Sequence, residues 1–342
     1  EAAGSTSLPR YTTTFRDAYR MAPRDLRKRE PAANSESLSL RLNYRPPYDF
    51  EAMLSFLRGR ALPGVERVDA QQYTRVIGTR DAPGWLRVSA WPADDGTAQH
   101  ALRLEVHGCT PAQLLDVVNR VRRMFDLDAD PQVIARALSK DPRLAALVQR
   151  SPGLRLPSGW DGFEIAMRAI IGQQVSVAAA RTVTARVSQR FGDPLPPALA
   201  ELGFAHLFPR PQQLVDADLA AIGLTRARAQ TIRTVSAALL EGRVDFRAEH
   251  TLEDFTRRWI ALPGIGPWTA QYIAMRALGH PDAFPAEDLV LQRALPDGGS
   301  RLGAEALLAS PRVTLAGYVC FGLFVGGFLV KLALGGTTLA YG

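Results

Sequence analysis

The chain has 342 residues, 46% of them hydrophobic, which is enough to bury a large core spread over two or three domains. A formal net charge of +7 and a pI of about 9.8 favour an anionic partner, nucleic acid before a membrane surface. Two cysteines exclude a disulfide framework, so we expect a protein of the reducing cytoplasm. The positive charge is almost entirely arginine, which suits phosphate contacts, although a GC-rich genome would give the same bias.

Residues 1–30 are basic and contain regularly spaced aromatic residues. Phe15, Tyr19, Pro23 and Arg27 are spaced as at the end of an AraC-type helix-turn-helix domain, and we predict a remnant of one; an ordinary basic tail is the alternative. Residues 31–37 are polar and are predicted to be a linker. No signal peptide opens the chain, and Glu1 indicates a part of a longer product.

Residues 38–125 are predicted to form a small α+β domain. Alternating hydrophobic and polar residues predict strands over 38–44, 74–78, 85–91 and 101–108, with turn residues between them. Helical patterns occupy 49–60 and 111–125. We expect an antiparallel sheet with one or two helices.

Residues 126–310 are predicted to form a mostly helical domain, which makes the fold class α+β. Asp130-Pro131 and Asp141-Pro142 have the form of helix starts, with a capping side chain before a proline. A hydrophobic period near 3.6, which includes Ile165, Ala169, Val175 and Ala179, runs through 161–191. Further helices are predicted over 211–221, 225–241, 251–261 and 267–278.

The most specific motif is the run from Leu262 to Ala270, LPGIGPWTA, which lies between two of these helices. Gly264 and Gly266 allow a tight turn without a Cβ that would keep a phosphate away. The free N–H groups at the start of the second helix then point at the anion. The pattern therefore predicts a helix-hairpin-helix that holds a nucleic-acid backbone, whereas a bare Gly-x-Gly would be explained by the turn alone.

A carboxylate follows this hairpin: Asp288 lies 22 residues after Gly266, beside Glu287. Excision of a base leaves positive charge on the sugar, and a nearby carboxylate stabilises that cation and can orient a water. By itself Asp288 would be read as a helix cap. Its distance from the hairpin favours the catalytic interpretation.

The hairpin and this carboxylate together resemble the helix-hairpin-helix glycosylase superfamily, and within it the AlkA-type 3-methyladenine DNA glycosylase II. The supporting motifs are YRPPYDF at 44–50, PGLRLP at 152–157 and RAIIGQQVSVA at 168–178. The resemblance covers roughly residues 40–296. With the AraC-like segment, it implies the glycosylase part of an Ada–AlkA fusion.

The resemblance implies a role for each residue that matches the family motifs. Asp288 would be the catalytic carboxylate, and Gln174 would fill the gap left by a flipped base. The remaining implied sites are a base pocket of Phe56, Trp268 and Tyr272, DNA contacts at Gly264, Gly266 and Thr269, and a monovalent cation (Na or K) on the carbonyls of Ile260, Leu262 and Ile265. No cofactor is required. Taken singly, each of these aromatic residues is more often plain core.

Two absences indicate which chemistry to expect. Relatives that also cleave the strand carry a lysine where this chain has Trp268, and no lysine lies between Lys140 and Lys331. Relatives with an iron–sulfur cluster carry four cysteines after the hairpin, where this chain has Cys320 alone. The resemblance therefore implies a monofunctional, monomeric enzyme that acts with water on double-stranded DNA containing alkylated purines.

Two alternatives remain open. The chain could be a non-catalytic DNA-binding or regulatory protein in which Asp288 only caps a helix. It could also be a membrane-tethered protein, because residues 313–330 are uncharged and their 18 residues reach the lower limit for a membrane-spanning helix. A buried terminal helix would look similar, and we expect no membrane association. This atypical apolar tail, 311–342, lacks the family's Trp-Arg-Pro-Trp motif, and Leu289 replaces a tyrosine, so we expect weaker or narrower base recognition.

Overall fold

The structure is a computed structural model, and it describes residues 37–92, 100–140, 142–247 and 250–288. The AraC-like segment, nearly all of the predicted linker, Leu289 and the apolar tail therefore lie outside the described residues. Within the described ranges, no helix is both long and hydrophobic enough to cross a bilayer.

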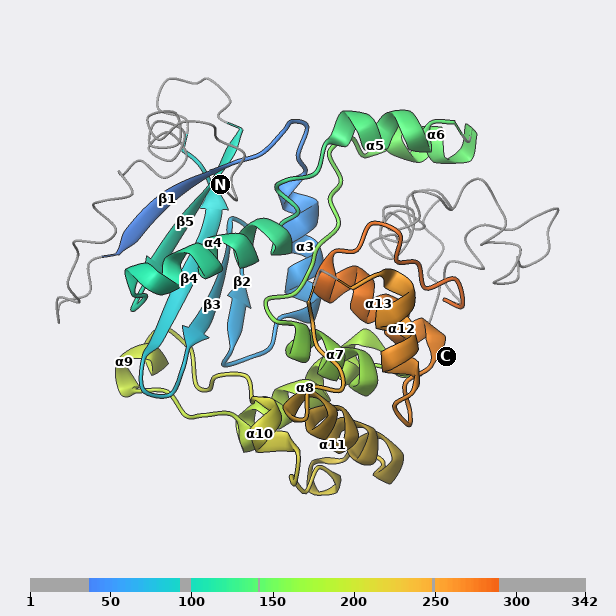
Figure 1. The fold of residues 1–342 in the computed structure, drawn as a ribbon. Helices are drawn as coiled ribbons and strands as arrows, with labels where there is room; N and C mark the ends of the chain where they lie inside the picture. Colours follow the sequence, from blue (N-terminus) through green and yellow to red (C-terminus); the bar gives the residue numbers. More distant parts are fainter. Residues whose placement is uncertain (1–36, 93–99, 141, 248–249, 289–342) are drawn as a thin grey trace.

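The first half of the described chain folds into one antiparallel sheet (Figure 1). Its strands are β1 (Leu38–Asn43), β2 (Glu66–Val68), β3 (Gln72–Gly78), β4 (Pro83–Ala90) and β5 (Ala101–His107). They lie in the order β1-β5-β4-β3-β2, and every neighbouring pair is antiparallel. The predicted strands are all present, whereas β2 was missed because three residues are too few to show an alternating pattern.

Two helices cover this sheet, as the hydrophobic pattern predicted. α3 (Phe50–Arg60) begins at Asp49, whose side chain accepts from the Ala52 amide at 2.8 Å. α4 (Pro111–Met124) crosses one face of the sheet (Figure 1). Leucine, valine and methionine side chains of both helices share a buried core with alternate residues of the strands.

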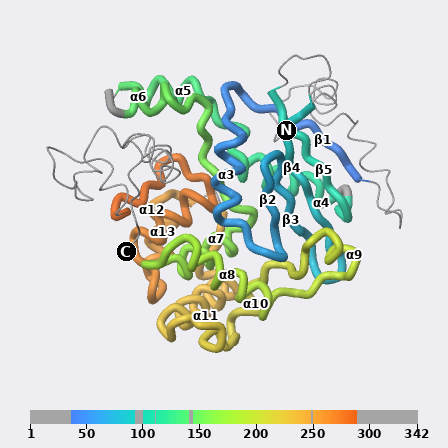
Figure 2. Tube along the Cα trace, turned by 180° about the vertical axis from the view of Figure 1, so that it is seen from behind, coloured from blue at the N-terminus to red at the C-terminus, as the bar shows by residue number. Residues whose placement is uncertain are grey.

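The second half is helical and packs beside α3 (Figure 2). Its elements are α5 (Pro131–Leu138), α6 (Pro142–Arg150), α7 (Gly162–Ile171), α8 (Val177–Phe191), α9 (Pro197–Ala200), α10 (Pro211–Leu214), the 3₁₀ turn η1 (Ala220–Ile222), α11 (Arg226–Leu240), α12 (Leu252–Ile260), α13 (Pro267–Ile273) and the π-helix η2 (Ala274–Leu278). The sheet followed by these helices confirms the predicted α+β class.

The segment 161–191 differs from the prediction, because it forms two helices instead of one continuous hydrophobic period. α7 ends at Gly172, and α8 starts after Ser176, whose hydroxyl accepts from the Ala179 amide at 3.2 Å. Val175, which the pattern placed on a buried face, is 39% exposed in the loop between them. The predicted helix over 211–221 is also shorter, since α10 ends at Leu214.

Two of the family-like motifs, YRPPYDF and PGLRLP, pack against each other. The Asp49 amide donates to the Gly153 carbonyl at 2.9 Å. Arg155 of PGLRLP is 1% exposed and donates to the Pro47 carbonyl of YRPPYDF at 3.2 Å and to the Ala129 carbonyl, just before α5, at 2.8 Å. These motifs therefore fasten the sheet to the start of the helical part and carry no reactive group.

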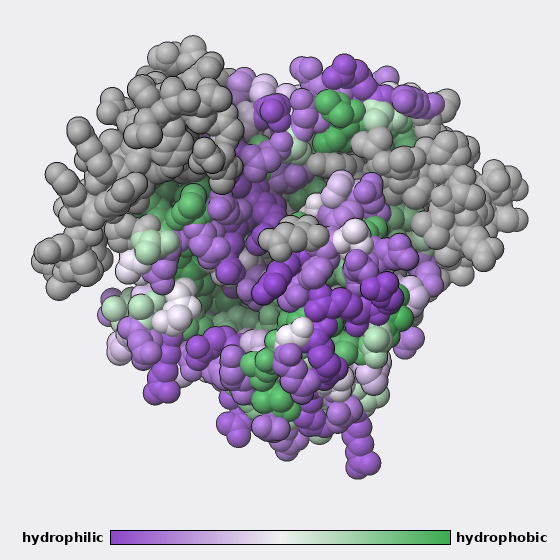
Figure 3. Space-filling view, viewed as in Figure 1, coloured by the Kyte–Doolittle hydropathy of each residue, from purple (hydrophilic) through white to green (hydrophobic). Residues whose placement is uncertain are grey.

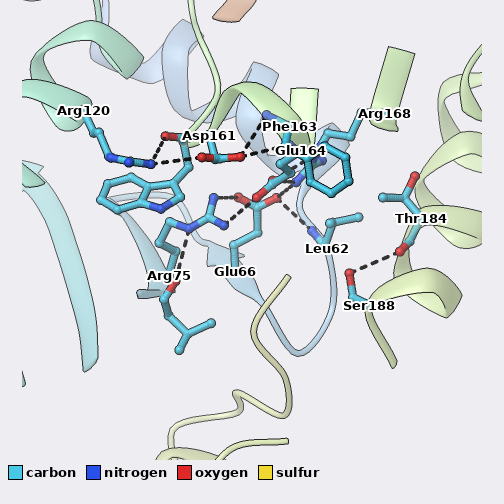
Figure 4. A network of polar contacts seen from close by, with 12 residues as sticks. Leu62, Glu66, Arg75, Arg120, Asp161, Phe163, Glu164, Arg168, Thr184 and Ser188 are labelled. Atoms are coloured by element: carbon cyan, nitrogen blue, oxygen red, sulfur yellow. Dashed lines mark hydrogen bonds and ion pairs between the residues drawn. The ribbon is translucent and has the colours of Figure 1, made fainter. Parts of the chain in front are cut away.

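A buried cluster of four charges joins β2 and β3 to α7 (Figure 4). Arg75 lies 2.7 Å from Glu164, and Arg168 lies 2.6 Å from both Glu164 and Glu66. The Tyr73 hydroxyl donates to Glu66 at 2.6 Å. Burial alone would raise the pKa of Glu164, but Arg75 and Arg168 outweigh it and lower the pKa to about 2.

The surface is hollowed between the two halves of the molecule. In the view of Figure 1, a recess with a hydrophobic floor and a largely hydrophilic rim opens between the sheet and the helices (Figure 3). Arg75 and Glu164 of the charged cluster line two separate cavities.

We predict that this cluster makes the free energy of unfolding depend on pH in the acidic range. The pKa of Glu164 falls from 4.5 to about 2 on folding, so its contribution is complete above about 4.5 and is lost as pH falls toward 2. Urea unfolding should show the free energy of unfolding declining through this window, with a shallower decline in Glu164→Gln. That variant should also lose about 3–5 kcal/mol at neutral pH, because it unbalances a buried cluster.

The control is Glu241→Gln, which removes an exposed carboxylate paired with Arg243. It should keep the wild-type pH dependence and lose at most about 1 kcal/mol. An equally steep acid decline in Glu164→Gln and wild type would contradict the assignment.

Candidate active site

The turn between α12 and α13 uses its two glycines differently. Gly264 has a φ of +86°, and a Cβ there would lie 2.0 Å from the Thr231 hydroxyl of α11. Gly266 has an extended backbone, and no atom lies within 4 Å of where its Cβ would be. Gly264 is therefore required by the fold, whereas Gly266 leaves open space at the start of α13.

The amides beside that space have no partner among the described residues. No described acceptor satisfies the N–H groups of Gly266, Trp268 or Thr269, and no side chain caps α13. Free N–H groups at a helix start form a site for an anion. The Thr269 side chain itself is buried, 3% exposed, so only its backbone is oriented for this role.

The carbonyls predicted to hold a monovalent cation lie in the same turn. Leu262 accepts one hydrogen bond, from the Ile265 amide at 3.1 Å, while no described donor reaches the carbonyls of Ile260 and Ile265. Neutral oxygen donors of this kind suit a hard cation of low charge. The residues therefore fit the implied ion, which would add positive charge beside the open amides. No group of three or more metal-binding side chains exists in the part of the chain that the structure describes.

The loop between α7 and α8 is tied to the hairpin. The Gln173 side-chain amide donates to the Gly264 carbonyl at 3.2 Å and to the Thr269 hydroxyl at 3.1 Å. The next residue, Gln174, is exposed and has a φ of +56°, a strained value for a residue with a side chain. The structure thus presents the predicted wedge residue on a loop that Gln173 holds against the hairpin.

Asp288 is buried, 6% exposed, and is held in place by Trp268 of α13. The indole N–H of Trp268 donates to the Asp288 carboxylate at 2.9 Å. Gln271 fastens the loop that carries this carboxylate, since its side chain accepts from the Phe284 amide at 3.0 Å. Glu287, the neighbouring acid, is exposed, so the buried carboxylate of the two is the one that the sequence analysis selected.

A cavity of about 200 Å³ lies between α3, α7, α8 and α13. All three predicted pocket residues, Phe56, Trp268 and Tyr272, line it. The rings of Trp268 and Tyr272 are stacked, with centroids 5.0 Å apart. Asp288 does not line the cavity, but it is hydrogen-bonded to Trp268, which does. The structure therefore brings the predicted pocket and the predicted carboxylate to one place.

The cavity also contains charges that the sequence did not predict there. Guanidinium groups of Arg60 and Arg276 lie 3.8 Å and 4.8 Å from the centre of the Phe56 ring. A cation on an aromatic face gains about 0.5–2 kcal/mol. Two unit charges 4 Å apart at an effective dielectric of 20 repel by about 4 kcal/mol, so neighbouring charges outweigh ring stacking.

Sequence reasoning missed the residues that position this site. Gln173, Gln271 and Ser158 act through hydrogen bonds to segments far along the chain, which no local pattern reveals. Of these three, only Gln173 could have been found from the sequence, because it lies in the family-like motif RAIIGQQVSVA at 168–178.

An antiparallel sheet, a helix-hairpin-helix and a carboxylate beside an aromatic cavity define the fold of a DNA-repair glycosylase. Residues 39–161 match the AlkA N-terminal domain, and residues 167–301 match the HhH-GPD superfamily base excision DNA repair protein. The DNA-3-methyladenine glycosylase 2 of Escherichia coli K12 is 36% identical over 258 residues, which is 75% of this chain and 86% of that protein. The chain belongs to the HhH-GPD superfamily of base excision DNA repair proteins, which confirms the AlkA-type resemblance.

Two further relatives extend the comparison. A probable bifunctional transcriptional activator/DNA repair enzyme AlkA of Mycobacterium tuberculosis CDC 1551 is 38% identical over 299 residues, 86% of this chain and 58% of that protein. This chain thus spans little more than half of that relative. The structure of the 3-methyladenine DNA-glycosylase from Archaeoglobus fulgidus shares the fold with a TM-score of 0.72, at 24% identity, over 85% of this chain and 99% of that one.

The two glycines of the hairpin provide a matched pair of variants. Gly264→Ala should lose about 2 kcal/mol or more of stability, because its φ is positive and its Cβ would collide with Thr231. Gly266→Ala should change stability by less than about 0.5 kcal/mol, because its Cβ would enter open space.

Duplex DNA affinity, measured by fluorescence anisotropy, should instead fall in Gly266→Ala. The added methyl group occupies the space where we predict a phosphate to lie. Wild-type affinity of the Gly266→Ala protein would show that the hairpin is not part of the DNA-binding surface.

Proposed function

We propose that this chain is a monofunctional DNA glycosylase that flips an alkylated purine out of the duplex and hydrolyses its N-glycosidic bond. The observation that carries the proposal is the Trp268–Asp288 hydrogen bond, which holds a buried carboxylate beside an aromatic cavity. The names of the relatives from E. coli and M. tuberculosis support the same activity.

Recognition of the DNA backbone and of the base would depend on one helix. α13 starts with the open amides at Gly266 and Trp268, and the rings of Trp268 and Tyr272 from the same helix line the cavity. A phosphate held at its start would therefore place the neighbouring nucleotide close to the cavity mouth. Contacts to phosphate do not read sequence, as a search for rare damage requires.

Gln174 would occupy the gap left in the duplex. It is exposed on a loop flanked by Val175 and Val177, which are 39% and 45% exposed. The hydrophobic neighbours suit contact with stacked bases, and the glutamine amide can hydrogen-bond to the base left without a partner.

The chemical step assigned to Asp288 is electrostatic. As the bond from C1′ to the base nitrogen breaks, its electron pair leaves with the base and positive charge develops on the sugar. The Asp288 carboxylate stabilises that charge and orients a water, whose oxygen bonds to C1′ as its proton passes to the carboxylate. No lysine exists in the described helical domain after Lys140, so no amine competes with water, and the strand stays intact.

The chemistry available at the site favours purines with a weakened glycosidic bond. The aromatic rings of the cavity can stack on a flat base, while the described site offers one carboxylate and no further acid in the lining beyond Glu66 and Glu164, which are paired with arginines. Alkylated purines such as 3-methyladenine and 7-methylguanine are activated leaving groups and need little more. The proposed partner is therefore double-stranded DNA containing alkylated purines.

A non-catalytic DNA-binding protein is the second candidate, and the burial of Asp288 beside the cavity argues against it. Release of labelled bases from methylated duplex DNA decides between the two. The wild-type protein should release alkylated purines and leave strands that break only after alkali treatment. Asp288→Asn should be slower by at least about 100-fold.

Glu287→Gln is the matched control, because it neutralises the adjacent but exposed acid. It should retain the wild-type rate. Base release by Asp288→Asn at the wild-type rate, or none by the wild type, would show that the chain is not this enzyme.

A separate prediction concerns Trp268. Trp268→Phe keeps a ring in the cavity but removes the N–H that orients Asp288. Because a small misplacement of a catalytic group is costly, we expect kcat to fall by about 10–100-fold with little change in DNA affinity. Single-turnover excision and anisotropy measure the two quantities, and an unchanged kcat would assign Trp268 to stacking alone.

A further inference from the structure

The helix that follows the hairpin ends in a wide turn that buries an arginine. α-Helical bonding stops at Ile273, and the π-helix η2 follows over Ala274–Leu278. π turns are rare and are often found at functional sites. This one is held from outside, because the Ser158 hydroxyl donates to the Arg276 carbonyl at 2.6 Å. Arg276 is only 3% exposed.

Arg276 differs from the other buried arginines of the described chain. Arg75 is paired with Glu164, and Arg155 donates to several backbone carbonyls. No described carboxylate lies within 4.0 Å of the Arg276 guanidinium, no described acceptor bonds to it, and its Nε is buried without a partner. A buried guanidinium without a carboxylate or a hydrogen-bond acceptor is costly, and such an unsatisfied group calls for an explanation, a functional role among them.

The surroundings of this guanidinium belong to the candidate base cavity. It lies 4.8 Å from the ring centre of Phe56 and 5.7 Å from that of Tyr272, and all three residues line the cavity. Arg60 lies over the same Phe56 ring. Burial lowers the pKa of Arg276, and the charge of Arg168 lowers it further against the opposite effect of Tyr272. The aromatic end of the cavity is therefore positively charged.

We propose that Arg276 is a specificity-determining residue of this cavity. Its charge disfavours purines that are themselves cationic, and its unused donors favour neutral purines that present a carbonyl oxygen. The inference rests on the proposed function, since it places a flipped base among these rings. Cationic lesions have a weaker glycosidic bond than neutral purines and therefore react faster once bound. Arg276 affects the binding step instead, and its charge there offsets part of that advantage.

The test separates charge from shape by changing the DNA. Duplexes containing 7-methylguanine or 7-methyl-7-deazaguanine differ in base charge but hardly in shape. Their affinities are measured in an Asp288→Asn background, which slows excision. We expect the neutral base to bind at least about tenfold more tightly than the cationic one.

Two variants of residue 276 identify the source of that preference. Arg276→Met removes the charge and Arg276→Lys keeps it, and both replacements are unbranched and favour helices. Asp288→Asn also changes the local charge, but it is present in every protein compared. The deciding quantity is therefore how the ratio of the affinities for the neutral and the cationic base changes with residue 276. The ratio of the two affinities should fall toward one in Arg276→Met and persist in Arg276→Lys, with no loss of thermal stability in either variant and unchanged binding of undamaged duplex.

A second pair of duplexes tests the donors of Arg276. Hypoxanthine carries a carbonyl oxygen that unsubstituted purine lacks, and both are neutral. Arg276→Met should abolish a preference for hypoxanthine that Arg276→Lys retains in part.

The outcomes also distinguish this inference from the proposed function. Equal ratios in Arg276→Met and Arg276→Lys, or no difference in binding between any damaged and undamaged duplex, would overturn the inference. If the ratios depend on residue 276 while the wild type releases no base, the inference stands and the proposed catalysis fails.

Discussion

The two halves of this protein are joined by a cluster of ion pairs in which no charge can be removed without leaving another unpaired. Glu66 and Arg75 come from the sheet, and Glu164 and Arg168 come from α7. Each contacts a partner of opposite sign; the first three are buried and the Arg168 side chain is 20% exposed. Removing any one leaves another uncompensated inside the protein. Arg168 also donates to the Arg60 carbonyl at the end of α3, at 2.8 Å. The cluster thereby sets Phe56, which comes from α3, at a defined position relative to the rings of α13.

That constraint explains why a cavity survives between two tightly packed cores. Aromatic rings on α3 and α13, which belong to different halves, form its walls. Their spacing is set by the ion pairs between the sheet and α7 and by the Gln173 hydrogen bonds to the hairpin. The carboxylate is positioned in the same manner, by Trp268 on one side and the Gln271-bound loop on the other. Each part of the candidate site is thus oriented by a polar contact with a distant segment.

Sequence reasoning succeeded where the signal was local. The alternation in β3 to β5, the helical pattern of α3 and the hairpin run were all readable from spacing and residue type. It failed where the structure depends on partners remote in the chain: the gap between α7 and α8, the short strand β2 and the change from α to π geometry at Ala274. The unpaired state of Arg276 is invisible in a sequence, because it is defined by what does not lie nearby.

The bond between Gln173 and the hairpin has a consequence for how damage is located. The residue that would enter the duplex, Gln174, directly follows one that is bonded to the backbone-gripping turn. If the hairpin holds a phosphate and Gln174 enters the duplex as proposed, the number of nucleotides between them would be set by the protein and would not vary with the DNA sequence. In the proposed function, every position along a duplex would be tested at the same offset, and a base pair weakened by damage would open there most easily.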